Sequence, residues 1–289
     1  TSDILTTANL PATLGADAPY ENMGTIQTKG WELAIDYRHT FKNGLHFGVT
    51  ASVADDKTEV TKWTYNTKIP SYGATGWWDK SAYKEGMVLG DIWGLQFDRF
   101  LTEDDFNADG SLKAGLPDQT KVFPAGYQFA PGDVLYKDLD NNGEIVKQTN
   151  TNDKGDLSVI GNALPRLQFG LNLDAAWKGF DISMFFQGVA KRKLWAAGNQ
   201  VLPGFTTGEP FYKGAEDYWT PENTDAFYPR PMDYKQSASG NYSVNDRYLL
   251  NMAYLRLKTF TVGYSLPKVW LSKFKVQGLR VYFTGENLF

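Results

Sequence analysis

The sequence predicts an all-β fold, more specifically an antiparallel β-barrel whose strands cross a membrane. Three observations lead to this prediction: segments in which apolar and polar residues alternate, an asymmetry between tight turns and long loops, and aromatic residues at the ends of the alternating segments. The composition agrees, because aromatic residues make up 15% of the 289 residues. A mean hydropathy of -0.41 is compatible with a barrel, since every second residue of its strands faces a polar interior.

The alternation is clearest from Leu167 to Trp177. Every second residue there is apolar, and the residues between them, such as Gln168 and Asn172, are mostly polar or glycine. The same pattern is found in three further segments, residues 31–38, 45–53 and 279–284. Because successive side chains of a strand point to opposite faces, each segment is predicted to be a strand with one apolar and one polar face.

Tight turns follow two of these strands. Residues 41–44 contain the Asn-Gly pair that suits a type I′ hairpin, and Lys178-Gly179 is predicted to form a similar tight turn between two strands. A short turn of helix is predicted for residues 267–275. The other connections are long, and loops of such length are usually functional; they cover residues 55–86, 101–165 and 190–245. Tight turns at one rim and long loops at the other are typical of an outer-membrane barrel.

A soluble antiparallel β-sandwich is the alternative, because its strands alternate in the same way. Two features favour the barrel. The alternating segments approach the ~9–11 residues that a tilted membrane-crossing strand needs. Aromatic residues also stand at strand ends, where interfacial girdles belong; these are Trp31, Tyr37, Trp177, Phe180 and Tyr264.

Composition and motifs exclude several classes of function. The net charge of -4 gives no electrostatic basis for binding nucleic acid. Cysteine is absent, which excludes disulfides and thiol nucleophiles, and the two histidines, His39 and His46, are too few for a histidine-based centre. The phosphate-loop, metalloprotease and serine-hydrolase motifs are missing. The sequence therefore predicts a protein that is not an enzyme.

The segment DLDNNGEI is the candidate metal loop. Asp138, Asp140 and Asn142 occupy the first, third and fifth positions of a calcium loop, and the Glu144 carbonyl takes the seventh. The twelfth position, which needs a bidentate glutamate, is Thr149, so the segment is not an EF-hand. The alternative is a polar turn whose side chains cap their own backbone.

Aromatic residues of the long loops are the candidate substrate contacts, because flat rings beside polar groups suit sugars and extended peptides. The residues chosen are Trp77, Trp78, Tyr212, Tyr218 and Trp219. The alternative is that these rings pack the loops together or contact a partner protein.

The run PGDVLYKDLDNNG from Pro131 to Gly143, followed by DLSVIGN from Asp156 to Asn162, resembles the signature PGDxxYKDxNxDG…DxxxIGN. That signature belongs to the SusC/RagA family of TonB-dependent outer-membrane transporters. Further blocks resemble the family in the right order, at residues 29–36, 165–188, 217–231, 254–267 and 279–289.

The resemblance implies a barrel of about 22 strands, within the range of known barrels, with long extracellular loops and an N-terminal plug. We expect residues 1–289 to be a C-terminal-side part of that barrel, without the plug, the first strands and the final strands, and with residues 131–162 as a calcium-loop-like insertion. Family members place an aspartate before the VIGN run. Here that residue is Asp156, with Asp153 as a possible substitute, and a bound Ca²⁺ would be structural.

The resemblance also implies the function: import of glycans, oligosaccharides or peptides through the outer membrane of a Gram-negative bacterium. The implied partners are a SusD-like surface lipoprotein, TonB acting through the N-terminal part, the transported substrate and outer-membrane lipid, with no nucleic acid. Interior-facing Glu32, Asp36, Arg38 and Asp174 could touch substrate, pair with one another or contact the plug. The alternatives are a soluble calcium-stabilised carbohydrate-binding sandwich and a siderophore receptor of the same barrel fold.

Overall fold

The computed structural model describes residues 1–7, 15, 19–63, 84–147, 153–198, 200–204, 211–232 and 240–289. Two compact units are found. The loop unit comprises residues 1–27, 58–164 and 193–250, and the sheet unit comprises residues 28–57, 165–192 and 251–289. In the part of the chain that is described, no helix is long and apolar enough to cross a membrane.

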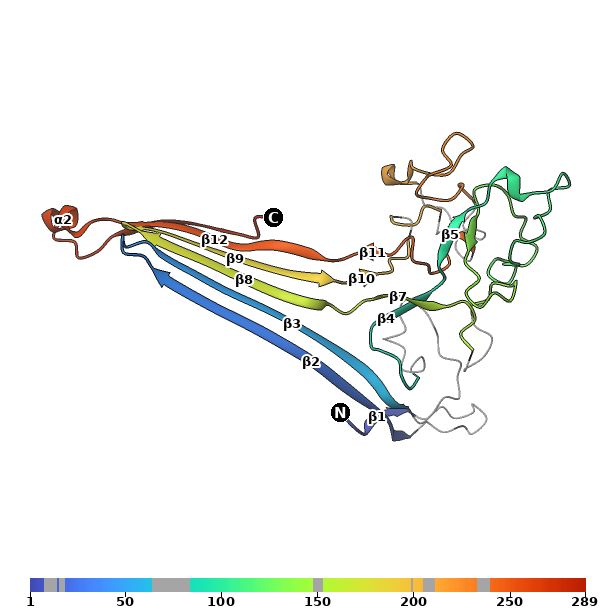
Figure 1. Ribbon diagram of the computed structural model, residues 1–289, viewed down its shortest axis with the longest axis horizontal. Coiled ribbons are helices and arrows are strands. Elements are labelled where there is room, and N and C mark those ends of the chain that lie inside the picture. Colours follow the sequence, from blue (N-terminus) through green and yellow to red (C-terminus); the bar gives the residue numbers. More distant parts are fainter. Residues whose placement is uncertain are drawn as a thin grey trace. The chain divides into compact units, whose positions relative to one another are not determined.

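Seven strands form one sheet in the order β1-β2-β3-β8-β9-β12-β13 (Figure 1). Their bounds are β1 (Ile4–Thr7), β2 (Tyr20–Thr40), β3 (His46–Trp63), β8 (Arg166–Trp177), β9 (Phe180–Lys191), β12 (Tyr254–Ser265) and β13 (Arg280–Glu286). The pairs β3–β8, β8–β9, β9–β12 and β12–β13 are antiparallel. The predicted all-β antiparallel architecture is confirmed.

Strand β3 is longer than the sequence predicted, because it continues to Trp63, past residue 55 where a loop was expected to begin. The strand continues where a neighbouring segment meets its backbone. Val60 donates its N–H to the Met87 carbonyl at 2.9 Å, and Leu89 donates to the Thr58 carbonyl at 2.9 Å. These partners come from residues far along the chain, so local alternation could not reveal them.

The pairing register gives the sheet two different faces. Ala51, Leu171 and Phe186 lie opposite one another on neighbouring strands and share one face. Ser52, Gly170 and Gln187 do the same on the other face. The apolar face is open on β2, where Trp31, Leu33 and Ile35 are 53%, 53% and 56% exposed. The sheet unit therefore presents uncovered apolar side chains on one side and polar groups on the other.

The tight turns form as predicted at one site and differently at the other. Lys178 and Gly179 have φ of 50° and 91°, the two positive values of a type I′ turn. In the 41–44 turn only Gly44 has a positive φ, at 81°, so the type I′ prediction is wrong there. Asn43 instead uses its side-chain oxygen to accept the N–H of Leu45 at 3.1 Å, which stabilises a turn without the left-handed conformation.

The predicted helical turn after β12 is confirmed. It consists of α2 (Lys268–Leu271) and a 3₁₀ turn at Ser272–Phe274. Leu271 is buried, and its carbonyl accepts the N–H of Val276 at 3.2 Å. The buried Leu271 side chain and this hydrogen bond stabilise the helical segment.

The loop unit has its own small sheets and core, although the sequence suggested long loops there. Its elements are β4 (Asp91–Gly94), β5 (Phe97–Phe100), β6 (Val134–Tyr136), β7 (Ser158–Asn162), β10 (Lys193–Leu194), β11 (Leu250–Asn251) and 3₁₀ turns at Glu103–Asp105 and Lys213–Ala215. β4 pairs with β7, β5 with β6 and β10 with β11. Leu95, Val134, Tyr136 and Ile145 are fully buried in its hydrophobic core.

A buried cluster of polar side chains around Asp133, which we call the ionic node, explains the PGD motif at residues 131–133 of this unit. Asp133 is fully buried and accepts hydrogen bonds from Arg230 Nε at 2.8 Å, Tyr127 Oη at 2.8 Å and Asn241 Nδ2 at 3.0 Å. Gly132 has φ of 90°, and a Cβ there would lie 2.5 Å from the Trp219 ring. The motif is thus needed for packing: only glycine fits, and the aspartate joins segments about a hundred residues apart.

Candidate functional site

Three carboxylates gather in the loop that follows β6. Asp138, Asp140 and Asp156 each offer one oxygen, and these oxygens lie within 4.8 Å of one another. Asp156 stands just before β7, so the chain returns to the start of the loop after residues 148–152, which are outside the described residues. The structure brings together three of the five acidic residues that the sequence selected as metal ligands.

The loop is shaped by its own side chains. The Asp138 carboxylate accepts the N–H groups of Asn141 at 2.7 Å and Gly143 at 2.8 Å, and the Asn142 side-chain oxygen accepts the N–H of Glu144 at 2.7 Å. These are the bonds expected of a polar turn. Each carboxylate oxygen keeps a further lone pair, so the same geometry leaves ligand capacity for a cation.

Asp156 closes the loop from its far end. It is fully buried, and its two oxygens accept the N–H groups of Leu139 and Val146, each at 2.8 Å. Two backbone donors offset part of the cost of burying a carboxylate. The side chain therefore ties both sides of the loop together within reach of Asp138 and Asp140.

The charges of the cluster act on one another. Loss of hydration, together with the negative charges of Asp138 and Asp156, raises the pKa of Asp140. Loss of hydration also raises the pKa of Asp138, but the N–H groups of Gly143 and Asn141 outweigh it and leave that pKa below its ordinary value. Carboxylates this close together repel one another, and a cation between them would relieve the repulsion. Ca²⁺ prefers oxygen ligands of this kind. The residues present fit such an ion.

The other selected residues lie differently. The Glu144 carboxylate forms an ion pair with Lys121, so only its carbonyl stays available for the predicted role. The Asn142 amide nitrogen donates to Asp140 Oδ2 at 3.0 Å. Asp153 is outside the carboxylate cluster and accepts the N–H of Gly155 at 2.9 Å.

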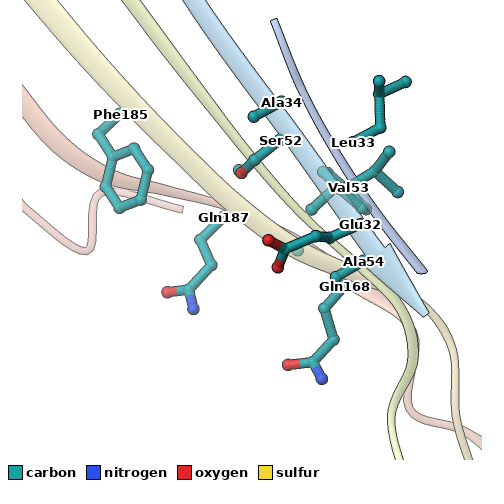
Figure 2. A pocket seen from close by; sticks show the side chains of 12 residues that line it. Glu32, Leu33, Ala34, Ser52, Val53, Ala54, Gln168, Phe185 and Gln187 are labelled. Carbon is teal, nitrogen blue, oxygen red and sulfur yellow. The ribbon is translucent and has the colours of Figure 1, made fainter. Parts of the chain in front are cut away.

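A second candidate site is a concavity on the polar face of the sheet unit, with a volume of about 380 Å³. Figure 2 shows Glu32, Gln168 and Gln187 directed to the same side of the sheet, and Leu33 on the opposite side. The Phe185 ring forms one wall. The site therefore offers a carboxylate, two amides and an aromatic face to a ligand.

Small residues make this concavity possible. Ser52 lies opposite Gly170, and Gly170 lies opposite Gln187, so the centre of the site has little side-chain volume. A Cβ on Gly170 would lie 3.2 Å from Ser52 Oγ and 3.5 Å from the Phe185 ring. The longer side chains of Glu32, Gln168 and Gln187 surround these small residues.

The alternation in the sequence predicts Glu32 on the interior face but does not connect it with Gln168, Gln187 or Phe185. Alternation shows which face each residue takes, whereas the register between strands decides which of them meet. The other three predicted interior residues have partners nearby: Asp36 and Arg38 pair with each other at 3.3 Å, and Asp174 lies 3.5 Å from the imidazole of His46.

The aromatic candidates divide into three groups. Trp219 is only 7% exposed and packs in the core of the loop unit, so its expected role in stacking on substrate is corrected to one in packing. Tyr212 and Tyr218 are exposed. Trp77 and Trp78 lie outside the described residues.

No family model matches the chain. Sequence relatives are found over its full length: the TonB-dependent receptors P3 and P26 of Formosa agariphila are each 26% identical, and the chain covers 26% and 27% of them. TonB-dependent receptor SusC of Bacteroides thetaiotaomicron is 21% identical, with 26% of its length covered. The chain thus spans about a quarter of the length of the curated relatives it matches.

Solved structures agree on the fold. The RagAB peptide transporter matches 100% of the chain with a TM-score of 0.65 at 17% identity, and 28% of that protein chain is covered. The RagAB peptide importer in its open-open state gives a TM-score of 0.61. These relatives are receptors and transporters, not enzymes. The comparisons confirm what the motifs predicted: over its whole length the chain resembles TonB-dependent receptors of the SusC/RagA type and has the fold of a part of their β-barrel.

Proposed function

We propose that the chain forms part of the wall of an outer-membrane, TonB-dependent importer in a Gram-negative bacterium. The observation that carries this proposal is the two-faced sheet. Trp31, Leu33 and Ile35 are more than half exposed on one face, which is costly in water and favourable in lipid. The opposite face carries the polar groups that a water-filled interior requires.

We infer that the cargo is a glycan, an oligosaccharide or a peptide. The concavity around Glu32, Gln168 and Gln187 supports this assignment. Amide side chains both donate and accept hydrogen bonds, so they suit hydroxyl groups and peptide groups alike. The Phe185 ring adds a flat apolar surface for a sugar ring or an apolar side chain.

A SusD-like surface lipoprotein and TonB are the proposed partners, with TonB acting outside residues 1–289. The similarity to SusC and to RagAB supports a lipoprotein of this type. The two alternatives fit less well. A soluble sandwich would cover the apolar face with a second sheet, and a siderophore receptor of the same fold would lack the lipoprotein.

We also propose a structural Ca²⁺ held by Asp138, Asp140 and Asp156, with the Asn142 side chain and the Glu144 carbonyl as further ligands. The grouping of three carboxylate oxygens within 4.8 Å supports it. The ion would fix a long loop of the loop unit and would take no part in moving substrate.

Fractionation of the full-length protein tests the proposed function. We expect it in the detergent-extracted outer membrane, as a band whose mobility changes on heating, and we expect a surface lipoprotein to co-purify with it. Recovery of the native protein from the aqueous fraction without detergent would contradict the barrel. Recovery in the membrane without a lipoprotein, together with iron-regulated expression, would favour the siderophore receptor.

A further inference from the structure

The tight turns of the sheet unit lie side by side and form what we call the turn rim, residues 41–44, 178–179 and 266–279. Trp177 Nε1 donates to the Asn43 carbonyl at 3.3 Å, which connects the first two segments. Ser265 donates its N–H to the Gly179 carbonyl at 2.8 Å, which connects the second with the third. Figure 1 shows α2 at the end of the sheet where these turns are located.

The turn rim is basic. It contains five lysines and no acidic residue, and all five side chains are exposed: Lys42, Lys178, Lys268, Lys273 and Lys275. Few carboxylates lie next to the rim. Asp181 pairs with Arg280 at 2.5 Å, and Asp174 lies 3.5 Å from the imidazole of His46, so this carboxylate stands against five lysines. The lysines therefore leave a net positive charge at this end.

Large apolar side chains stand among the lysines. Val269 and Trp270 of α2 are 74% and 58% exposed, while Leu271 beside them is buried and anchors the turn. Trp177 and Phe180 are also exposed and lie at this end of the apolar face. Lys178 Nζ lies 4.5 Å from the centre of the Trp177 ring. The apolar face of the sheet thus continues into the rim, where aromatic rings and ammonium groups alternate.

We propose that the turn rim binds the head groups of anionic phospholipids in the membrane leaflet on that side. This inference rests on the proposed function, because it requires the apolar face to lie in lipid. Tryptophan side chains favour the membrane–water interface, and lysine stems can follow apolar surface while their ammonium groups reach phosphates. A free inorganic anion would match the charge but would leave Val269 and Trp270 without an apolar environment.

The test uses the full-length receptor in phosphatidylcholine vesicles that contain a trace of spin-labelled phosphatidylglycerol or spin-labelled phosphatidylcholine. The immobilised fraction of each label gives the relative association of the two lipids. We expect the wild type to prefer phosphatidylglycerol about fivefold, the effect of roughly one surface lysine. The triple variant Lys268→Gln/Lys273→Gln/Lys275→Gln should lower the preference to about twofold or less.

A matched triple variant outside the rim, Lys113→Gln/Lys137→Gln/Lys213→Gln, should keep the wild-type preference, because these exposed lysines belong to the loop unit. Inorganic phosphate at millimolar concentration should leave the preference unchanged, which separates a membrane surface from a site for free anions. In a second measurement, the part of the tryptophan fluorescence that is lost in Trp270→Phe should be quenched by lipids brominated near the head group more than by those brominated at the chain end. Stronger quenching by the chain-end bromines would contradict an interfacial position of Trp270.

Equal association of both lipids with a correctly inserted, heat-modifiable receptor would overturn the inference and leave the proposed importer intact. Equal losses in the two triple variants would also overturn it, since the effect would then be one of total charge. Failure of the receptor to associate with vesicles at all would instead contradict the proposed function.

Discussion

The loop unit and the sheet unit use the same kinds of apolar residues in opposite ways. In the loop unit, Val134, Tyr136 and Ile145 are fully buried inside the protein. In the sheet unit, Leu33, Ile35 and Phe283 are more than half exposed. Burying such a side chain stabilises a fold by roughly 1.5–3 kcal/mol, so the first unit gains this energy within the chain and the second can gain it only from its surroundings.

Polar side chains also have different roles in the two units. The loop unit buries them as structural connections, as Asp133 and Asn241 do. The sheet unit keeps them on an accessible face, where Glu32, Gln168 and Gln187 surround a concavity. Substitutions in the loop unit should therefore act through internal packing and pairing, and substitutions in the sheet unit should act according to the face they occupy.

The largest effect is expected at the ionic node of the loop unit. Asp133→Ala leaves the half-buried Arg230 guanidinium without its carboxylate, which should cost about 3–5 kcal/mol. Hydrogen exchange should show lost protection of β6 amides. As a control, Asp109→Ala removes an exposed carboxylate of the same unit that accepts hydrogen bonds from the N–H and the hydroxyl of the nearby Ser111. Unchanged protection in Asp133→Ala would mean that the node contributes little.

The next effect separates the two faces of the sheet unit. Leu171→Arg places a charge on the apolar face, and near the membrane midplane this should cost about 2–4 kcal/mol. Asn172→Arg, the neighbouring residue on the polar face, is the matched control and should cost less than about 1 kcal/mol. Urea titrations of the receptor in vesicles measure both. Similar losses in the two variants would contradict the assignment of faces.

Removal of the proposed Ca²⁺ should give a comparable or smaller change, confined to the loop unit. At a concentration a hundredfold above its dissociation constant, an ion that binds only the folded state stabilises it by about 2.7 kcal/mol. A chelator, or Asp138→Ala/Asp140→Ala, should increase hydrogen exchange around residues 138–147, and Asp104→Ala should not. Selective loss of substrate affinity with normal loop order would contradict the structural role.

The smallest effect concerns pH. Hydrogen bonds from Arg99, at 2.6 and 2.8 Å, lower the pKa of Asp105 from 3.8 to about 2. The folded pKa is below the unfolded one, so the contribution is complete above about pH 4 and is lost as the pH falls towards 2. Since Arg99 is partly exposed, we expect about 1–2 kcal/mol. The free energy of local unfolding around Asp105, measured between pH 2 and 5, gives the size of this contribution. Asp105→Asn should remove the pH dependence.

The sheet unit could be predicted from the sequence because its signals are local. Period-two alternation predicted strands at 31–38, 45–53, 167–177 and 279–284, and all of these residues except 45 and 279 lie in observed strands. The turn at Lys178-Gly179 and the helical turn after β12 were predicted for the same reason. Even here the concavity depended on register, which alternation does not specify.

The loop unit was harder to predict because its contacts are distant in sequence. Trp93 of β4 pairs with Val159 of β7, and Asp133 bonds to Asn241. Short strands of two to five residues leave no clear periodic pattern, so the sequence suggested loops. For the same reason Trp219 was taken for a substrate contact, although Gly132, far from it in the chain, makes room for its ring in the core.

A cysteine scan along β8 tests most directly the claim that the sheet separates lipid from a polar interior. The chain has no cysteine, so single spin labels can be placed at each position from 167 to 177 in a cysteine-free full-length receptor in vesicles. We predict that odd-numbered positions are accessible to oxygen dissolved in lipid and that even-numbered positions are accessible to a water-soluble nickel complex. Equal access of the nickel complex to both sets of positions would contradict the account.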